Sequence, residues 1–211
     1  MKLENLLSIK PLLVTSVLAM SVFGTSFQAL AGHHKNSAYE LQANQSQLTF
    51  FSIKSGSIGE VHEFKSLNGN IDKDGLATIT IDLTSVETGI EIRNERMKSM
   101  LFNTNEFTTA QVQTEVSLDA LKALKVGESF HRHVPVTLNL HGQSQKLTAH
   151  SDVVKIADNK IVIYSTKPAV VDASQFGLVD GIAALQKIAG LPSIATSVPV
   201  TFKLTFELPS K

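Results

Sequence analysis

"SVPVTFKLTFEL", Ser197 to Leu208, is the stretch of the chain with the most regular alternation of apolar and polar side chains. After Ser197, its aliphatic and aromatic residues fall on even numbers, while the proline, the threonines, Lys203 and Glu207 fall on odd numbers. Successive side chains of a β-strand point to opposite faces, so the pattern predicts a strand with one buried and one solvent-facing side. The even-numbered residues of the buried side are Val198, Val200, Phe202, Leu204, Phe206 and Leu208.

Similar alternation recurs in seven earlier stretches, which predicts about eight strands in all. The connections are short, as at "DKDG" and "ADN", and this favours antiparallel pairing. Amphipathic antiparallel strands in this number form either a sandwich or a closed barrel. We expect an all-β fold, an eight-stranded antiparallel barrel, whose interior is packed by side chains or holds one slim ligand. The seven earlier stretches are residues 47–54, 61–71, 76–83, 110–118, 133–142, 145–156 and 160–171.

Two segments interrupt the alternation with apolar residues at helical spacing. They are "EIRNERMKSMLFN", Glu91 to Asn103, and "DGIAALQKIAGLP", Asp180 to Pro192, where glycine and proline supply the stop signals. We expect two short helices that cap the ends of the barrel. A helical rotation of about 100° per residue places Arg93 on the apolar stripe of the first helix, beside Met97. That guanidinium either ties the helix to the barrel or meets the polar head of a ligand.

The first residues of the chain have the character of an export signal. Lys2 and Lys10 precede an apolar run that is too short to span a membrane comfortably, and "ALA" ends at Ala31 as a small-residue cleavage site. We therefore expect a signal peptide at 1–31, a flexible leader at 32–38 and one domain at 39–209, with location in the periplasm and no stable membrane anchor. The chain has no cysteine, so its core alone must stabilise it.

Histidines raise the question of a metal site. Cleavage after Ala31 would make His34 the third residue, and an N-terminal amine, two amides and that imidazole can bind copper(II) or nickel(II); this stays open. His131 and His133 share one strand face, but it is the polar one, so we expect them to be exposed. His150 lies mid-strand with no obvious partner. No metal site is expected in the barrel.

Neither the charge balance nor the motifs point to an enzyme or a nucleic-acid-binding protein. Lys plus Arg and Asp plus Glu both number 19, so no basic surface is expected to attract nucleic acid. The stretch "SGSIG" around Ser57 lacks the spacing of a hydrolase nucleophile turn, and no dinucleotide or phosphate-binding loop is found. We expect no catalytic residues and no cofactor.

The segment "TSVETGIEIRNERMKSMLFN", Thr84 to Asn103, resembles the YceI-like family of exported lipid-binding proteins. That family has Thr-Ser-Val-x-Thr followed by a short helix with Arg-Asp-x-His-Leu-Arg; here Asn94 stands at the Asp and Arg96 at the His. "VTLNLHGQSQKLTA" and "SVPVTFKLTFEL" are similar to later strands of the family, so the resemblance covers about residues 39 to 208. It implies a lipocalin-like periplasmic barrel that binds a polyisoprenoid or fatty-acid derivative and is not an enzyme.

We therefore expect a long-chain lipid inside the barrel, with inward strand residues as its walls and residues of both helices at its mouths. Two alternatives remain: a hydrolase or isomerase that acts on a similar amphiphile, and a packed barrel that serves a surface interaction. The sequence also leaves open a homodimer. The expected ligand-binding residues are Phe50, Ile79, Ile81, Arg93, Met97, Met100, Leu101, Phe102, Val136, Leu138, Ile182, Leu185, Ile188, Phe202 and Leu204.

Overall fold

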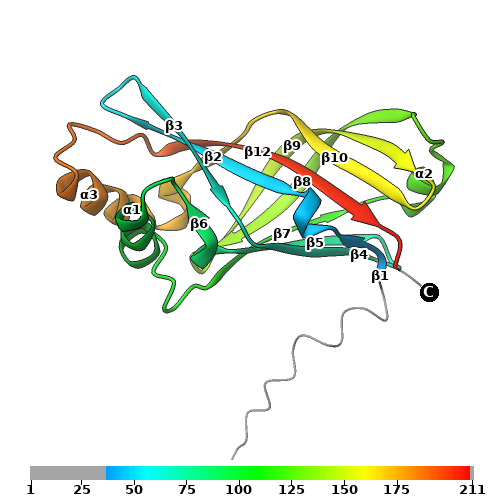
Figure 1. Cartoon of the computed structure of the whole chain (residues 1–211), viewed down its shortest axis with the longest axis horizontal. Coiled ribbons are helices and arrows are strands. Elements are labelled where there is room, and N and C mark those ends of the chain that lie inside the picture. The colour runs from blue at the N-terminus through cyan, green and yellow to red at the C-terminus, as the bar shows by residue number, and fades with distance from the viewer. Residues whose placement is uncertain (1–36, 210–211) are drawn as a thin grey trace, which may run out of the picture. The chain divides into compact units, whose positions relative to one another are not determined.

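The structure, a computed structural model, describes residues 37–209 (Figure 1). The predicted signal peptide, residues 32–36 of the predicted leader and the N-terminal site at His34 lie outside the described residues. Ser37 and Ala38, expected in the leader, belong instead to the first strand, because Ser37 pairs with Asp72. Across residues 37–209, the helices are too short or too polar to cross a membrane.

The strands form a closed eight-stranded antiparallel β-barrel, as the sequence predicted. The ring runs β1-β4-β5-β7-β8-β9-β10-β12 and closes where Leu41 pairs with Phe206. All pairings in the ring are antiparallel. The ring strands are β1 (Ser37–Leu41), β4 (Leu67–Asp72), β5 (Leu76–Asp82), β7 (Thr109–Glu115), β8 (Ser129–Leu140), β9 (Gln143–Ala157), β10 (Lys160–Lys167) and β12 (Ser197–Glu207).

Four further strands lengthen the wall of the barrel at one end. β2 (Gln47–Lys54) continues β1 after the short helix η2 (Ala43–Gln45) and pairs with β12, and β3 (Ile58–Phe64) precedes β4 and pairs with β2. In the same way β11 (Ala169–Asp172) continues β10 along β12. β6 (Val86–Glu87) follows the helix η3 (Leu83–Ser85) and pairs with β3. Each of the two strands predicted at 61–71 and 160–171 therefore corresponds to two consecutive strands in the structure, β3 and β4 in the first case and β10 and β11 in the second.

The β8–β9 hairpin has a tight two-residue turn. His141 and Gly142 both have positive φ, 51° and 73°, as the two central residues of a type I′ turn require. The turn fixes the register, with Leu140 opposite Gln143 and His133 opposite His150. Odd-numbered residues of β9 and even-numbered residues of β8 consequently share the inner face, and the remaining residues of both strands share the outer face.

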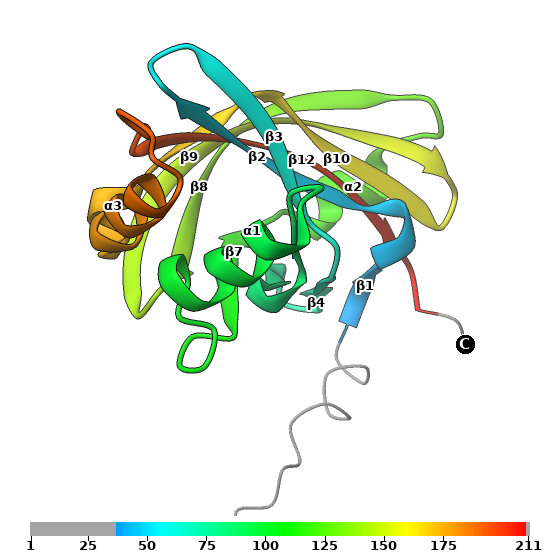
Figure 2. The ribbon, with the colours of Figure 1, turned by 60° about the vertical axis from the view of Figure 1, so that its left-hand side comes forward.

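Both predicted helices exist, but they lie at the same end of the barrel instead of at opposite ends (Figures 1 and 2). α1 (Glu91–Arg96) passes into the π-helix η4 (Met97–Leu101), and α3 (Val179–Ile188) follows η5 (Ala173–Phe176). Gly181 allows the contact: a Cβ there would lie 2.6 Å from the carbonyl oxygen of Met100 and 2.8 Å from Cα of Leu101. We call the end of the barrel that carries both helices the α1/α3 end.

The opposite end carries α2 (Leu118–Ala123), which the sequence analysis missed. Its first residue lay in the stretch at 110–118 that we expected to be a strand. Ser117 begins the helix, since its side chain accepts a hydrogen bond from the amide of Ala120 at 3.2 Å. Leu121, 2% exposed, anchors α2 on the barrel.

Candidate functional site: the barrel interior

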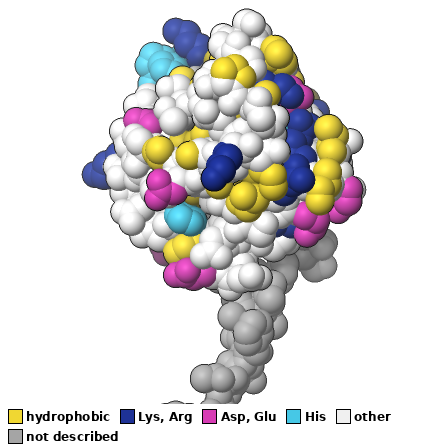
Figure 3. Space-filling view, turned by 90° about the vertical axis from the view of Figure 1, so that its left-hand side faces the viewer, with side chains coloured by type: hydrophobic (Ala, Val, Ile, Leu, Met, Phe, Trp, Pro, Cys, Tyr) yellow, Lys and Arg dark blue, Asp and Glu magenta, His cyan; other side chains and the backbone are white. Residues whose placement is uncertain are grey.

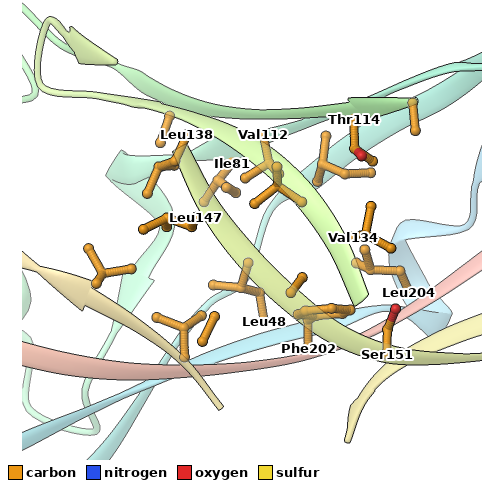
Figure 4. A pocket seen from close by; sticks show the side chains of 18 of the residues that line it. Leu48, Ile81, Val112, Thr114, Val134, Leu138, Leu147, Ser151, Phe202 and Leu204 are labelled. Carbon is orange, nitrogen blue, oxygen red and sulfur yellow. The ribbon is translucent and has the colours of Figure 1, made fainter. Parts of the chain in front are cut away.

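The barrel encloses a cavity of about 340 Å³ that runs from the α1/α3 end to the α2 end. Its lining joins Leu101 and Ile182 at the first end to Ala120 and Leu121 at the second. The volume lies within the range of about 300–1,000 Å³ found for ligand pockets. Inward residues from every side form the wall, and Figure 4 shows Val112 and Leu138 facing Phe202 across the space.

The inward strand residues that the sequence predicted all line this cavity. Alternation places one side chain in two on the inner face, and the same parity that identified Phe202 identified its neighbours. Their role in ligand binding stays a prediction. The residues are Phe50, Ile79, Ile81, Val136, Leu138, Phe202 and Leu204.

Predicted residues of the helical segments fall into two groups. Leu101, Phe102 and Ile182 line the cavity. Met97 is buried in the core, and Met100 and Leu185 are half-buried, but none of the three is part of the lining. Ile188 is 49% exposed and also lies outside the lining, because the last turn of α3 extends beyond the wall.

The loose winding of η4 explains why Met100 lies outside the cavity lining. The amide of Phe102 bonds to the carbonyl of Met97 at 2.9 Å, five residues back, so the segment winds more loosely than an α-helix. The rotation of about 100° per residue therefore fails after Met97. Phe102 is turned into the barrel, where its ring lies 5.7 Å from that of Phe64.

Arg93 joins α1 to the neighbouring strand β3 and is not part of the cavity lining. Its Nη1 donates to Oε2 of Glu60 at 2.8 Å, and its Nη2 donates to the carbonyl of Thr88. Lys54 donates to the second oxygen of Glu60, also at 2.8 Å. These hydrogen bonds, Lys54 first, hold the pKa of the Glu60 carboxyl below its ordinary value. These contacts favour the hypothesis that Arg93 ties the helix to the barrel over the hypothesis that it binds the polar head of a ligand.

His62, which sequence reasoning did not single out, is a buried residue of β3, two positions after Glu60. It is 3% exposed, its ring lies 5.2 Å from that of Phe50, and its Nε2 lies 2.8 Å from the Ser52 hydroxyl. Burial, with a smaller effect from the Arg93 charge, lowers its pKa. The alternation in β3 was the available signal, because His62 pairs with inward-facing Phe50.

Polar side chains of the lining gather at the α2 end. Thr114 donates to the carbonyl of Pro135 at 2.8 Å, and the guanidinium of Arg132 lies 4.7 Å above the ring of Phe130. Among the described residues that line the cavity, only Glu115 and Arg132 carry charge, and both are exposed. The polar lining residues are Thr114, Glu115, Ser117, Arg132 and Ser151.

The outer surface at the α1/α3 end carries several apolar side chains beside basic and acidic ones (Figure 3). Ile90 precedes α1, Ile92 lies on it, and they are 49% and 59% exposed. Val179 and Ile188 on α3 are 42% and 49% exposed. This end of the cavity is therefore bordered by helices whose outward faces are partly hydrophobic.

Comparison with solved structures found several similar barrels. A polyisoprenoid-binding domain from Saccharophagus degradans, implicated in plant cell wall breakdown, is 38% identical, with a TM-score of 0.80, and the match covers 82% of this chain and 99% of that one. BcnA of Burkholderia cenocepacia is 19% identical, with a TM-score of 0.58 and coverage of 78% and 98%. The YceI protein of Campylobacter jejuni is 14% identical, with a TM-score of 0.53 and coverage of 71% and 85%.

Comparison with the curated proteins found no match. The two more distant structures support the fold alone, a lipocalin-like barrel. The YceI-like domain matches residues 39–206, which span the whole ring from β1 to β12. With this match and the 38% identity to the S. degradans domain, the chain belongs to the YceI-like family.

Proposed function

We propose that this protein is a periplasmic carrier that holds a long apolar chain, a polyisoprenoid or fatty-acid derivative, inside the barrel. The observation that carries the proposal is the end-to-end apolar cavity. The polyisoprenoid binding of the S. degradans domain supports the ligand class. Burial of about ten methylenes would contribute about 8 kcal/mol, and the cost of ordering the chain reduces this.

The bound ligand is oriented with its polar head at the α2 end. The hydroxyl and charged groups of the lining lie there, while the opposite end contributes Phe102, Leu101 and Ile182. Arg132 stands at inward parity near the start of β8, where it can meet a hydroxyl, carboxylate or phosphate without being buried. A few such groups suffice to orient an amphiphile in an apolar site.

The same observations weigh against the two alternatives. A hydrolase or isomerase needs convergent titratable groups near its substrate, whereas Glu115 and Arg132 are the only ionisable groups among the described lining residues and both are exposed. A fully packed barrel would have no cavity of this size. Location in the periplasm follows from the export signal expected at 1–31 and is part of the proposal.

The test is to purify the exported protein without denaturant, extract it with organic solvent and identify co-purifying lipid by mass spectrometry. Ala149→Phe would fill the cavity from β9, since Ala149 is 7% exposed and lines it. Thr148→Phe is the matched control, because the neighbouring residue is exposed on the outer face. We expect lipid with the wild-type protein and the control, and little with Ala149→Phe.

A second filling variant, Ser151→Leu, guards against a local folding defect in the first, and circular dichroism checks both. Absence of any long-chain amphiphile from the wild-type extract would overturn the proposal. So would equal lipid content in folded Ala149→Phe, Ser151→Leu and Thr148→Phe.

A further inference from the structure

A cluster of three histidines lies on the outer face of the barrel, away from the cavity. His131 and His133 are on β8, and His150 is on β9, directly opposite His133. The sequence analysis expected the first two to be exposed and found no partner for His150. The first expectation is confirmed. The second is wrong, because the two-residue turn at His141 and Gly142 brings His150 beside His133.

The three imidazoles are close enough to share one ion. A ring nitrogen of each lies within 4.8 Å of one from each of the others. The ring centroids of His131 and His133 are 4.9 Å apart, and those of His133 and His150 are 4.4 Å apart. Nitrogens around a tetrahedral zinc ion with bonds of about 2.0–2.1 Å are about 3.4 Å apart, so side-chain rotations that bring the nitrogens closer by up to about 1.4 Å would complete the geometry.

A carboxylate orients one of these rings from behind. Nδ1 of His131 lies 2.6 Å from Oδ1 of Asp152, which faces it across the β8–β9 pair, and the Tyr164 hydroxyl donates to the other carboxylate oxygen at 3.2 Å. With Nδ1 held, Nε2 of His131 is the nitrogen available to a ligand. A histidine that is hydrogen-bonded to a carboxylate in this way is the usual arrangement at protein metal sites.

His150 supplies a second, independent observation. Its Nδ1 is buried and has no hydrogen-bond partner among residues 37–209. A buried polar atom without a partner is costly, and an ion shared with His133 would satisfy it. Lys167, opposite His150 on β10, disfavours a cation, and the charge of Asp152 offsets it.

We propose that His131, His133 and His150 form a binding site for a divalent transition-metal ion, with Asp152 as the residue that positions His131. Three imidazoles suit Zn²⁺ and Cu²⁺ and leave a coordination position open to solvent. A bound ion would join β8 to β9 on the outer wall. The site does not depend on lipid binding, because these side chains point away from the cavity.

The test uses the full chain without a histidine tag and with His33→Ala and His34→Ala, which remove the N-terminal candidate ligands. Zn²⁺ is titrated in competition with a chromophoric chelator, and Cu²⁺ is followed by electron paramagnetic resonance for nitrogen coordination. We expect one ion per chain, bound at least 100-fold more weakly in His133→Ala and His150→Ala. Asp152→Asn should weaken binding about 10- to 100-fold.

Thr148→Ala is the matched control on the same face of β9 and should bind the ion as the parent does. Circular dichroism shows whether each variant is folded, and His131→Ala provides an independent removal of one ligand. Equal Zn²⁺ and Cu²⁺ affinities in the parent, His150→Ala and His133→Ala would overturn the proposal, as would a Cu²⁺ spectrum without nitrogen coordination in the parent.

Discussion

Arg93 on α1 donates to Glu60 on β3 at 2.8 Å, and this salt bridge joins the helix to the strand that lengthens the barrel wall. The two side chains are 25% and 28% exposed, so solvent screens the pair in part. The Thr88 carbonyl is a second acceptor for the same guanidinium. The arginine on the apolar stripe of the helix therefore has permanent protein partners.

Replacement of Arg93 by Met should lower the free energy of unfolding by about 1–2 kcal/mol, since it removes a partly screened charged hydrogen bond and leaves the Thr88 carbonyl without this donor. The loss should be the same in lipid-loaded and delipidated protein, measured by urea unfolding. Arg96→Met, with no described salt bridge, is the control. A loss of lipid retention at unchanged stability would instead assign Arg93 to the ligand.

Gly181 gives a case in which helix propensity and packing predict opposite results. Ala in place of Gly inside α3 should stabilise an isolated helix by about 1 kcal/mol. The added Cβ would lie 2.6 Å from the Met100 carbonyl oxygen, and backbone atoms cannot move away cheaply. We expect Gly181→Ala to lower the melting temperature and to loosen α3 from η4.

Ala183→Gly, at an exposed position of the same helix, measures the propensity effect alone. Hydrogen exchange of the α1/α3 end would locate the change in Gly181→Ala. A rise in its melting temperature would contradict the close approach of the two segments.

The outcome for the strands shows what alternation can predict. Seven of the eight ring strands were expected, because their inward residues must be apolar whether the barrel is filled or hollow. β1 was missed since five residues, "SAYEL", carry too little pattern. α2 was missed because Leu118 continues the parity of Val116, and the cap at Ser117 was the signal that went unused.

The candidate sites depended on information that alternation does not contain. Parity gave the inward wall, but the place of Met100 depends on the loose turn of η4 and that of Ile188 on where α3 extends past the wall. The histidine cluster required the register of β8 and β9. That register follows from a two-residue turn at "HG", so the sequence did hold the signal for His150.

The buried His62 should make stability depend on pH. Its pKa is lowered by burial and then by Arg93, while Glu60 acts in the opposite direction and Lys54 in the same direction as Arg93. The unfolded chain therefore binds the proton more readily. The contribution of neutral His62 to the free energy of unfolding should be fully present above about pH 6.5, the pKa of histidine in the unfolded chain. It should be lost as the pH falls from there toward the lower pKa of the folded state.

Thermal melts from pH 8 to pH 5 in the presence of a chelator measure this effect. His62→Gln should flatten the profile across this window. Desolvation also lowers the pKa of His150, so His150→Gln is the control that measures how much of the profile this second histidine causes. An unchanged pH dependence in His62→Gln would show that another group causes it.

The inward parity of the last strand can be tested with two neighbours. Phe202 lines the cavity, and Lys203 is exposed on the outer face. Phe202→Asp should cost at least about 3 kcal/mol and can prevent folding, since it loses the ring and places a carboxylate among apolar groups. Lys203→Asp should change stability by less than about 1 kcal/mol. Similar losses in the two variants, by urea unfolding, would show that the facing is misassigned.

Arg132 tests the proposed orientation of the ligand. It is the cation among the described lining residues, it lies over the Phe130 ring at 4.7 Å, and the other polar lining groups share its end. Arg132→Met keeps a flexible, unbranched apolar stem and removes the guanidinium with its charge. We expect the delipidated variant to bind a long-chain fatty acid about 5- to 10-fold more weakly, as loss of one partly exposed charge-assisted hydrogen bond of about 1–1.5 kcal/mol implies. Affinity for the matching fatty alcohol should change less than about 2-fold, because burial of the same hydrocarbon dominates there. Isothermal titration of both ligands measures the difference. Arg96→Met, at the opposite end, should affect neither; if it weakens the fatty acid while Arg132→Met does not, the head lies at the α1/α3 end.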